Sequence, residues 1–233
     1  MKKNGLFITG TDTGVGKTLV SAGLARLLVN RGLSVGMFKP VASGGRVSED
    51  GKLLQKAAKL SDAAYSSIVP LHYRQPLAPW VAGWKEGKVN LSKVEKAFQK
   101  AKVSCDFLIV EGVGGVQVPI TRDFFVTDWI VKWKMPALVV ARAGLGTINH
   151  TLLTVEALQR RKVKVLGVLI NNYTGKGIAE QTNMRALKKL LKVPVYGPLR
   201  FNIRYRNHLD QLARDFEKLK MPWIPLSGTK GRT

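Results

Sequence analysis

The chain has 233 residues, of which 45% are hydrophobic and 23% are charged, a composition typical of one globular α/β domain. It contains no apolar run of about eighteen residues, so no membrane-spanning helix is predicted, and its single cysteine, Cys105, excludes an internal disulfide. The 38 basic and 15 acidic residues give a net charge of +23, so a nucleic-acid-binding protein has to be considered.

Basic residues are spread over the whole chain, with denser stretches at residues 85–102 and 185–206. They form no basic arm, and the sequence carries no helix-turn-helix or RNA-binding signature. We therefore predict no specific nucleic-acid partner and no membrane partner, and interpret the charge as a lysine-rich surface that helps attract an anionic nucleotide. The lone cysteine, and a start that leads directly into the first strand, favour a cytoplasmic protein without a cleavable signal.

The first predicted elements enclose a glycine-rich loop at residues 10–18. An apolar run at residues 6–9 leads into Gly-Thr-Asp-Thr-Gly-Val-Gly-Lys-Thr, and an amphipathic helix is predicted for residues 19–31. A strand, a glycine-rich turn and a helix form the context of a phosphate-binding loop, because glycines let main-chain N–H groups approach phosphate oxygens. Lys17 is then expected at the β- and γ-phosphates, and the Thr18 hydroxyl at Mg²⁺.

The spacing of this loop departs from the common one. Four residues usually separate the two glycines, but position 11 is threonine and the preceding glycine is Gly10, so the loop is longer by a single residue. Asp12 stands where the partition and nitrogenase iron-protein group of ATPases carries a second lysine. The sequence therefore argues against that group.

Apolar runs alternate with amphipathic stretches along the rest of the chain. Strands are predicted at residues 33–38, 107–110, 137–141 and 163–170, and helices at residues 53–60, 91–102, 126–134, 148–160, 178–191 and 209–219. This alternation predicts right-handed βαβ units and a doubly wound, mostly parallel α/β sheet of the P-loop NTPase type. A single domain is expected over residues 1–226, with a polar tail at residues 227–233.

Charged residues follow two of the predicted strands, at the sheet edge where ligands of such folds bind. Lys39 is either a solvated lysine before a turn or a cation that neutralises a phosphoryl group or an anionic acceptor. Asp50 either caps a helix or supplies a carboxylate to Mg²⁺. Glu111 follows its strand like the acidic residue of a Walker B element, so Thr18, Asp50 and Glu111 form a possible magnesium set.

Three further segments follow strands. Gly112, Val113 and Gly114 either form a tight turn or let a second backbone segment approach a substrate. Residues 145–149 begin a helix whose free N–H groups suit a carboxylate, unless the helix is simply capped. Asn171 can pair with a purine edge, and the absence of an Asn-Lys-x-Asp element favours adenine over guanine.

Four segments together resemble the dethiobiotin synthetases, enzymes of biotin synthesis. They are residues 10–18, Lys-Pro-Val-Ala-Ser-Gly at 39–44, Val-Glu-Gly-Val-Gly-Gly at 110–115, and residues 145–154; the resemblance runs from Phe7 to about Leu199. It implies an ATP-dependent ligase that uses 7,8-diaminononanoate, CO₂, ATP and Mg²⁺. One amine captures CO₂ as a carbamate, ATP phosphorylates the carbamate, and the second amine closes the cyclic urea.

The resemblance also implies roles for the matching residues. Lys39 is the catalytic lysine at the carbamate, Lys17 acts at the phosphates, and Mg²⁺ is held by Thr18, Asp50 and Glu111. ATP is expected to contact Gly14, Val15, Gly16, Lys17, Thr18, Leu19, Asp50, Glu111, Gly112, Val113, Gly114, Asn171, Asn172, Arg200, Phe201 and Asn202. The diamine is expected to contact Thr13, Ser43, Leu145, Gly146 and Asn149. Members of the family are homodimers with sites at the subunit interface, so residues 145–149 are expected to act from the partner chain.

The chain departs from the family pattern at Gly14, Trp80, Asn172, Gln181 and Arg200, which bear on substrate affinity and base selectivity. Two other classes are weighed against this reading. A related amidating domain needs a glutaminase cysteine in a Gly-x-Cys-x-Gly context, which Cys105 lacks. A P-loop regulatory or nucleic-acid-associated ATPase is favoured by the +23 charge and disfavoured by Asp12.

Overall fold

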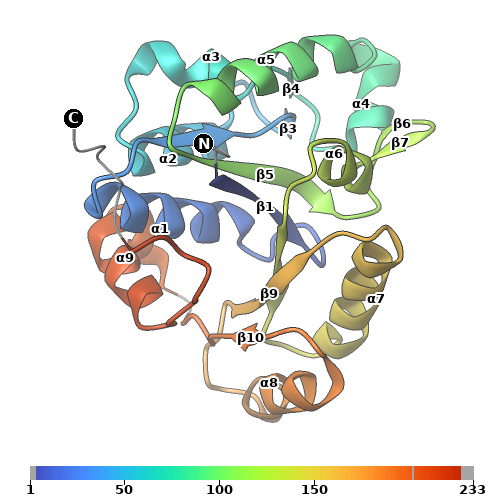
Figure 1. Cartoon of the computed structure of the whole chain (residues 1–233). Coiled ribbons are helices and arrows are strands. Elements are labelled where there is room, and N and C mark those ends of the chain that lie inside the picture. Colours follow the sequence, from blue (N-terminus) through green and yellow to red (C-terminus); the bar gives the residue numbers. More distant parts are fainter. Residues whose placement is uncertain (1–3, 201, 227–233) are drawn as a thin grey trace.

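The computed structural model describes residues 4–200 and 202–226, and its centre is a parallel β-sheet (Figure 1). The strand order is β10–β9–β8–β1–β5–β2, and every neighbouring pair runs parallel. The strands are β1 (Asn4–Gly10), β2 (Val35–Phe38), β5 (Phe107–Gly115), β8 (Ala137–Arg142), β9 (Val165–Asn171) and β10 (Val195–Tyr196). This arrangement confirms the predicted doubly wound α/β fold.

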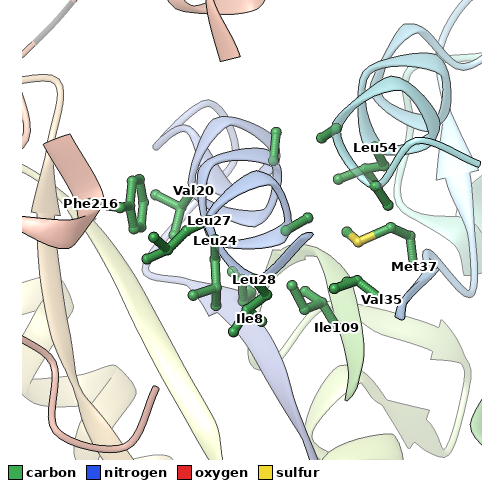
Figure 2. Close-up of a cluster of buried hydrophobic side chains, with 14 of the residues drawn as sticks. Ile8, Val20, Leu24, Leu27, Leu28, Val35, Met37, Leu54, Ile109 and Phe216 are labelled. Atoms are coloured by element: carbon green, nitrogen blue, oxygen red, sulfur yellow. The ribbon is translucent and has the colours of Figure 1, made fainter. Parts of the chain in front are cut away.

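Both faces of the sheet are covered by helices, which explains why its strands are continuous apolar runs. Because successive side chains of a strand point to opposite faces, Leu6 and Ile8 of β1 enter one apolar core and Phe7 enters the other. The first core packs against α1 (Lys17–Asn30), α2 (Glu49–Ala57) and α9 (Leu209–Glu217). In Figure 2, Leu24 and Leu28 of α1 lie between the sheet and Phe216 of α9.

The opposite face packs against four other helices: α5 (Leu91–Val103), α6 (Val126–Lys132), α7 (Thr147–Arg160) and α8 (Ile178–Leu190). Here Trp133 stacks on Phe98 with 4.0 Å between ring centroids, and on Trp129 with 5.5 Å. Cys105 is buried in the same core, as predicted. The aromatic stack closes the sheet face beneath β1 and β5, so the carboxyl ends of these strands have firm support.

The structure corrects two local predictions. The helix predicted at residues 53–60 is α2, which begins at Glu49 because the Ser48 hydroxyl accepts a hydrogen bond from Gly51 N at 3.1 Å. Ser48 is therefore the N-cap, and the reading of Asp50 as the cap is wrong. The strand predicted at residues 107–110 continues to Gly115, so residues 112–115 are strand rather than turn.

Several short elements were not predicted, because they are too short to show a hydrophobic period. They are β3 (Ala42–Ser43), η1 (Asp62–Ala64), α3 (Tyr65–Ile68), β4 (His72–Tyr73), α4 (Pro79–Glu86), β6 (Pro119–Thr121), β7 (Phe124–Phe125), β10 and η2 (Ile203–Arg206). None of the helices in the described ranges combines the length and apolar character needed to cross a bilayer. The predicted polar tail, residues 227–233, lies outside the described residues.

Candidate active site

The loop between β1 and α1 has the geometry of an anion site. Gly16 precedes the helix with a φ of 91°, and a Cβ there would lie 2.0 Å from Asn171 Nδ2, so only glycine fits. The first turn of α1 contains no acidic residue, and its free N–H groups are therefore not neutralised by a neighbouring carboxylate. This helix start can receive phosphate oxygens.

A cleft of about 430 Å³ opens at the carboxyl ends of β1, β2 and β5. Lys17, Lys39 and Glu111 all face it, although they are far apart in the sequence. The other predicted residues in its wall are Thr13, Gly14, Gly16, Thr18, Leu19, Ser43, Asp50, Gly112, Val113 and Gly114. Parallel strands end at the same sheet edge, which is why side chains after separate strands meet here.

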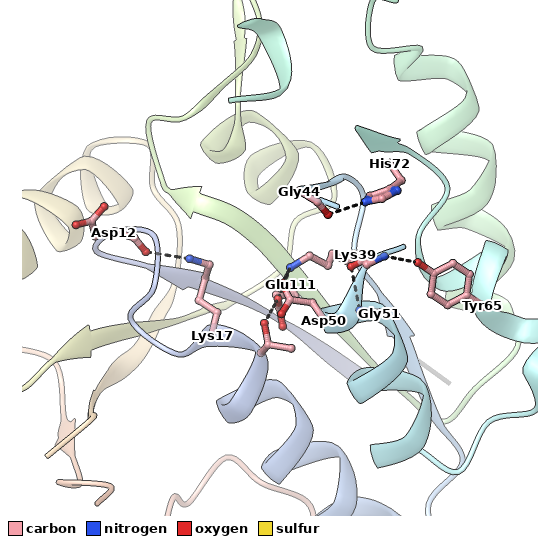
Figure 3. A network of polar contacts seen from close by, with 11 residues as sticks. Asp12, Lys17, Lys39, Gly44, Asp50, Gly51, Tyr65, His72 and Glu111 are labelled. Carbon is pink, nitrogen blue, oxygen red and sulfur yellow. Dashed lines mark hydrogen bonds and ion pairs between the residues drawn. The ribbon is translucent and has the colours of Figure 1, made fainter. Parts of the chain in front are cut away.

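Lys39 lies at the centre of a network of ion pairs and hydrogen bonds (Figure 3). Its Nζ is 2.5 Å from Glu111 Oε1 and 2.9 Å from Asp50 Oδ2, and Thr18 Oγ1 donates to Glu111 Oε1 at 2.8 Å. Burial opposes the charge of Lys39, but the two carboxylates outweigh it and raise the pKa of Lys39 above its usual value. Burial also opposes the charge of Asp50, but Lys39 lowers the pKa of this carboxyl. Lys39 is therefore a charged, fixed ammonium group.

Lys17 is buried in the same cleft but has different neighbours. Its Nζ donates to the main-chain oxygen of Asp12 at 2.9 Å, while the Asp12 carboxylate pairs with Arg142 at the end of β8. Burial is the largest influence and lowers the pKa of Lys17 to about 8, against the attraction of Glu111. An incoming phosphate would supply the negative charge that the Lys17 ammonium lacks.

The carboxylates and hydroxyl of this cleft fit a magnesium ion. Oε2 of Glu111 is buried and has no hydrogen-bond partner, although Oε1 has two. Within the described ranges, no three or more His, Cys, Asp and Glu side chains gather into a metal cluster. Mg²⁺ usually takes one or two carboxylates and completes its shell with phosphate and water, so Thr18, Asp50 and Glu111 match that preference.

Asn171 and Asn172 extend from the end of β9 to the back of the phosphate loop. Asn171 Nδ2 donates to Val15 O at 2.9 Å, and its Oδ1 is buried without a partner. Asn172 adopts a φ of 57°, a left-handed conformation that asparagine tolerates well. The free Oδ1 of Asn171 is an acceptor for an amino group such as that of adenine.

Some predicted contact residues are not part of the cleft wall. Leu145, Gly146 and Asn149 lie at the start of α7, and Leu145 is 88% exposed. Arg200 forms an isolated bridge with Tyr173, and the Asn202 side chain caps η2 by accepting from Arg204 N at 2.9 Å. Phe201 lies outside the described residues.

The cleft also contains residues that the sequence did not indicate: Leu53, Pro76, Leu77, Ala78, Val118 and Arg206. Arg206 is a third cation in the wall, and its charge helps to lower the pKa of Asp50. It comes from the dense basic stretch at residues 185–206, where no spacing separated it from surface arginines. The apolar group is a wall that suits a hydrocarbon chain.

A parallel sheet that leads through a glycine-rich loop into a free helix start, beside a buried lysine and a strand-end carboxylate, defines a P-loop nucleotide-binding protein. Residues 4–208 match a family model described as an AAA domain. The ATP-dependent dethiobiotin synthetase BioD of Endomicrobium trichonymphae is 41% identical over 197 residues, which cover 82% of this chain and 90% of the relative. That of Aquifex aeolicus is 41% identical over 82% of this chain and 86% of the relative. The chain belongs to the ATP-dependent dethiobiotin synthetase family.

Solved structures agree with the fold. The cell division ATPase MinD of Pyrococcus furiosus aligns with a TM-score of 0.57 at 16% identity, over 93% of this chain and 99% of that chain. Cobyrinic acid a,c-diamide synthase of Mycobacterium smegmatis, solved with ADP and magnesium, aligns with a TM-score of 0.52 at 16% identity, over 95% and 99%. At these identities the likeness concerns the fold alone.

Proposed function

We propose that this chain is a ligase that forms dethiobiotin from 7,8-diaminononanoate, CO₂ and ATP. One amine of the diamine attacks CO₂ and loses a proton to give a carbamate. A carbamate oxygen then takes the γ-phosphoryl group, which releases ADP, and the second amine attacks the carbonyl carbon and expels phosphate. The carrying observation is the cleft in which Lys17 and Lys39 face one another's anionic targets.

The central physical problem is that two anions, the carbamate and the γ-phosphate, must approach each other. Fixed cations in a partly desolvated cleft lower this repulsion most in the transition state, where the charges are closest. Lys39 is assigned to the carbamate, because its carboxylate partners hold the Nζ in place. Lys17 is assigned to the phosphates, because it extends across the loop that would cradle them.

Thr18, Asp50 and Glu111 are proposed to hold Mg²⁺, which when bound supplies Lewis-acid stabilisation of the phosphates. The buried free Oε2 of Glu111 supports this assignment. Main-chain groups around the loop and the glycine-rich end of β5 are proposed to surround the nucleotide, and Asn171 to bind adenine. The remaining proposed nucleotide contacts are Val15, Leu19, Asn172, Arg200, Phe201 and Asn202.

Thr13 and Ser43 are proposed to contact the diamine within the chain's own cleft. The start of α7, with Leu145, Gly146 and Asn149, is proposed to bind the substrate carboxylate in the cleft of a second copy. Support for a homodimer comes from the exposed apolar side chains of Leu145 and Ile178 at the starts of α7 and α8.

Subunit complementation tests the shared site. Lys39→Ala and Asn149→Ala are expected to be inactive or weak separately, but mixing them after mild dissociation should restore part of the turnover. Only a mixed dimer contains a site with both native residues. Light scattering should report a dimer, and a fully active monomer would contradict this proposal.

A phosphate-release assay tests the reaction itself. Protein, MgATP and bicarbonate should release phosphate only when 7,8-diaminononanoate is added, and mass spectrometry should detect the cyclic urea. Phosphate release that ignores the diamine would contradict the proposal and indicate a regulatory ATPase.

A further inference from the structure

A second hollow, of about 400 Å³, lies along the outer edge of β2. This strand is the last of the sheet on its side, so one of its edges has no neighbouring strand. We call the hollow the edge groove; β2 forms its floor, and α3 and α5 form its walls (Figure 1). Its lining residues include Val35, Met37, Ile68, Lys93 and Lys100, and none of its residues lines the catalytic cleft.

The edge groove stays open because small residues face it. Ala97 and Ala101 lie one turn apart on α5, and Ala64 faces them from the end of η1. The floor is apolar, with the buried side chains of Val35 and Met37. Cavities of a few hundred Å³ with an apolar lining and a few polar groups are the usual form of small-molecule sites.

The polar groups of the edge groove are cationic and hydroxylic. Lys93 and Lys100 are seven residues apart on α5, which places them on one helix face about 10 Å apart along the axis. Within the described part of the chain, neither ammonium group forms an ion pair, and no aspartate or glutamate lines the groove. Four serines, at positions 34, 66, 67 and 104, add hydroxyl groups. The charge of the groove is therefore positive and uncompensated, over an apolar floor.

The open edge of β2 is short. At its carboxyl end, Lys39 N donates to Ile68 O at 2.8 Å, so this part of the edge is already paired. The groove is thus a bounded hollow rather than a long edge that could accept an added strand. We propose that the edge groove binds a small amphipathic anion: a hydrocarbon chain that lies on Val35 and Met37, with a carboxylate held by Lys93 and Lys100.

Methyl NMR with [¹³C-methyl]methionine tests the site directly, with octanoate as the probe and 1-octanol as its neutral match. Met37 faces the groove, whereas Met135, Met184 and Met221 do not, and Met37→Leu assigns its signal. Octanoate should shift the Met37 methyl signal saturably, with the other three signals unmoved. The shift should persist when a non-hydrolysable ATP analogue fills the catalytic cleft. An unmoved Met37 signal, or a shift abolished by the ATP analogue, would overturn the proposal.

Substitutions separate the two halves of the recognition. Lys93→Gln with Lys100→Gln should weaken octanoate about tenfold, since a partly exposed ion pair contributes up to about 1 kcal/mol each, and should leave octanol unchanged. Ala97→Trp should fill the groove and abolish both responses, whereas Lys96→Trp, on the solvent side of α5, should abolish neither. Equal weakening of octanoate and octanol by the lysine changes would also overturn it. The readout needs no turnover, so its failure is distinct from failure of the proposed reaction.

Discussion

The phosphate loop and the end of β2 each place a buried lysine in the same cleft, yet their surroundings act in opposite directions. Lys17 contacts a main-chain oxygen, and burial lowers its pKa to about 8. Lys39 contacts two carboxylates, which outweigh burial and raise its pKa. Desolvation by itself would weaken the charge of both lysines, so the carboxylate partners decide the difference.

This contrast indicates two uses of a cation. The phosphate loop is incomplete without an anion, so binding of a nucleotide would stabilise the charge of Lys17. The end of β2 is electrostatically complete, because Glu111 and Asp50 already neutralise Lys39. Lys39 should therefore stay charged and stay in place over the whole working pH range. The following predictions test this difference, from the largest expected effect to the smallest.

Removing the β2 cation should have the largest effect. Lys39→Ala is expected to lower kcat roughly 10²–10⁴-fold, or about 3–5 kcal/mol of barrier, since no other side chain is assigned to the carbamate. The diamine-dependent phosphate assay measures it, with Lys52→Ala on the exposed side of α2 as the control. Unchanged turnover would exclude Lys39 from catalysis.

Removing the buried carboxylate should destabilise the protein. Glu111→Gln leaves Lys39 with only the partly exposed Asp50, and loss of a buried charge partner costs about 3 kcal/mol. Urea unfolding at constant pH measures this loss. Asp50→Asn is the matched control and should cost less, because Asp50 is partly exposed to water. Equal stability of the two variants would contradict the central role given to Glu111.

The phosphate loop should respond to pH. Below pH 8 Lys17 carries its proton in the free protein, and above it the ammonium is lost, so ATP affinity should fall by up to about tenfold per pH unit. For stability the sign is opposite: the folded state loses this proton near pH 8 and the unfolded state near 10.5, so stability from this group rises between them. Calorimetry in buffers of different ionisation enthalpy should detect proton uptake on ATP binding above pH 8. Constant affinity from pH 7 to 9.5 would refute the lowered pKa.

Support of the loop from β9 should have the smallest effect. Asn171→Ala removes one hydrogen bond to Val15 O and is expected to cost about 1 kcal/mol of stability, with a several-fold loss of ATP affinity. Fluorescence titration with an ATP analogue measures the affinity, and thermal unfolding measures the stability. A larger loss with GTP than with ATP would contradict adenine recognition by Asn171.

The sequence by itself determined the class of fold and the chemical character of the site. Long apolar runs indicated the strands of the sheet, because burial on both faces requires continuous hydrophobicity. The glycine-rich loop, Lys39 and Glu111 were visible as local patterns after strands, and the structure brings all three to one cleft.

Only the tertiary structure decided the contacts between segments. Ser48 rather than Asp50 caps α2, so Asp50 is left to pair with Lys39. Arg206 reaches the cleft because η2 returns to it, and no spacing along the chain records that approach. The opposite pKa shifts of Lys17 and Lys39 have the same origin, because charge pairing falls off steeply with distance and only packing sets those distances.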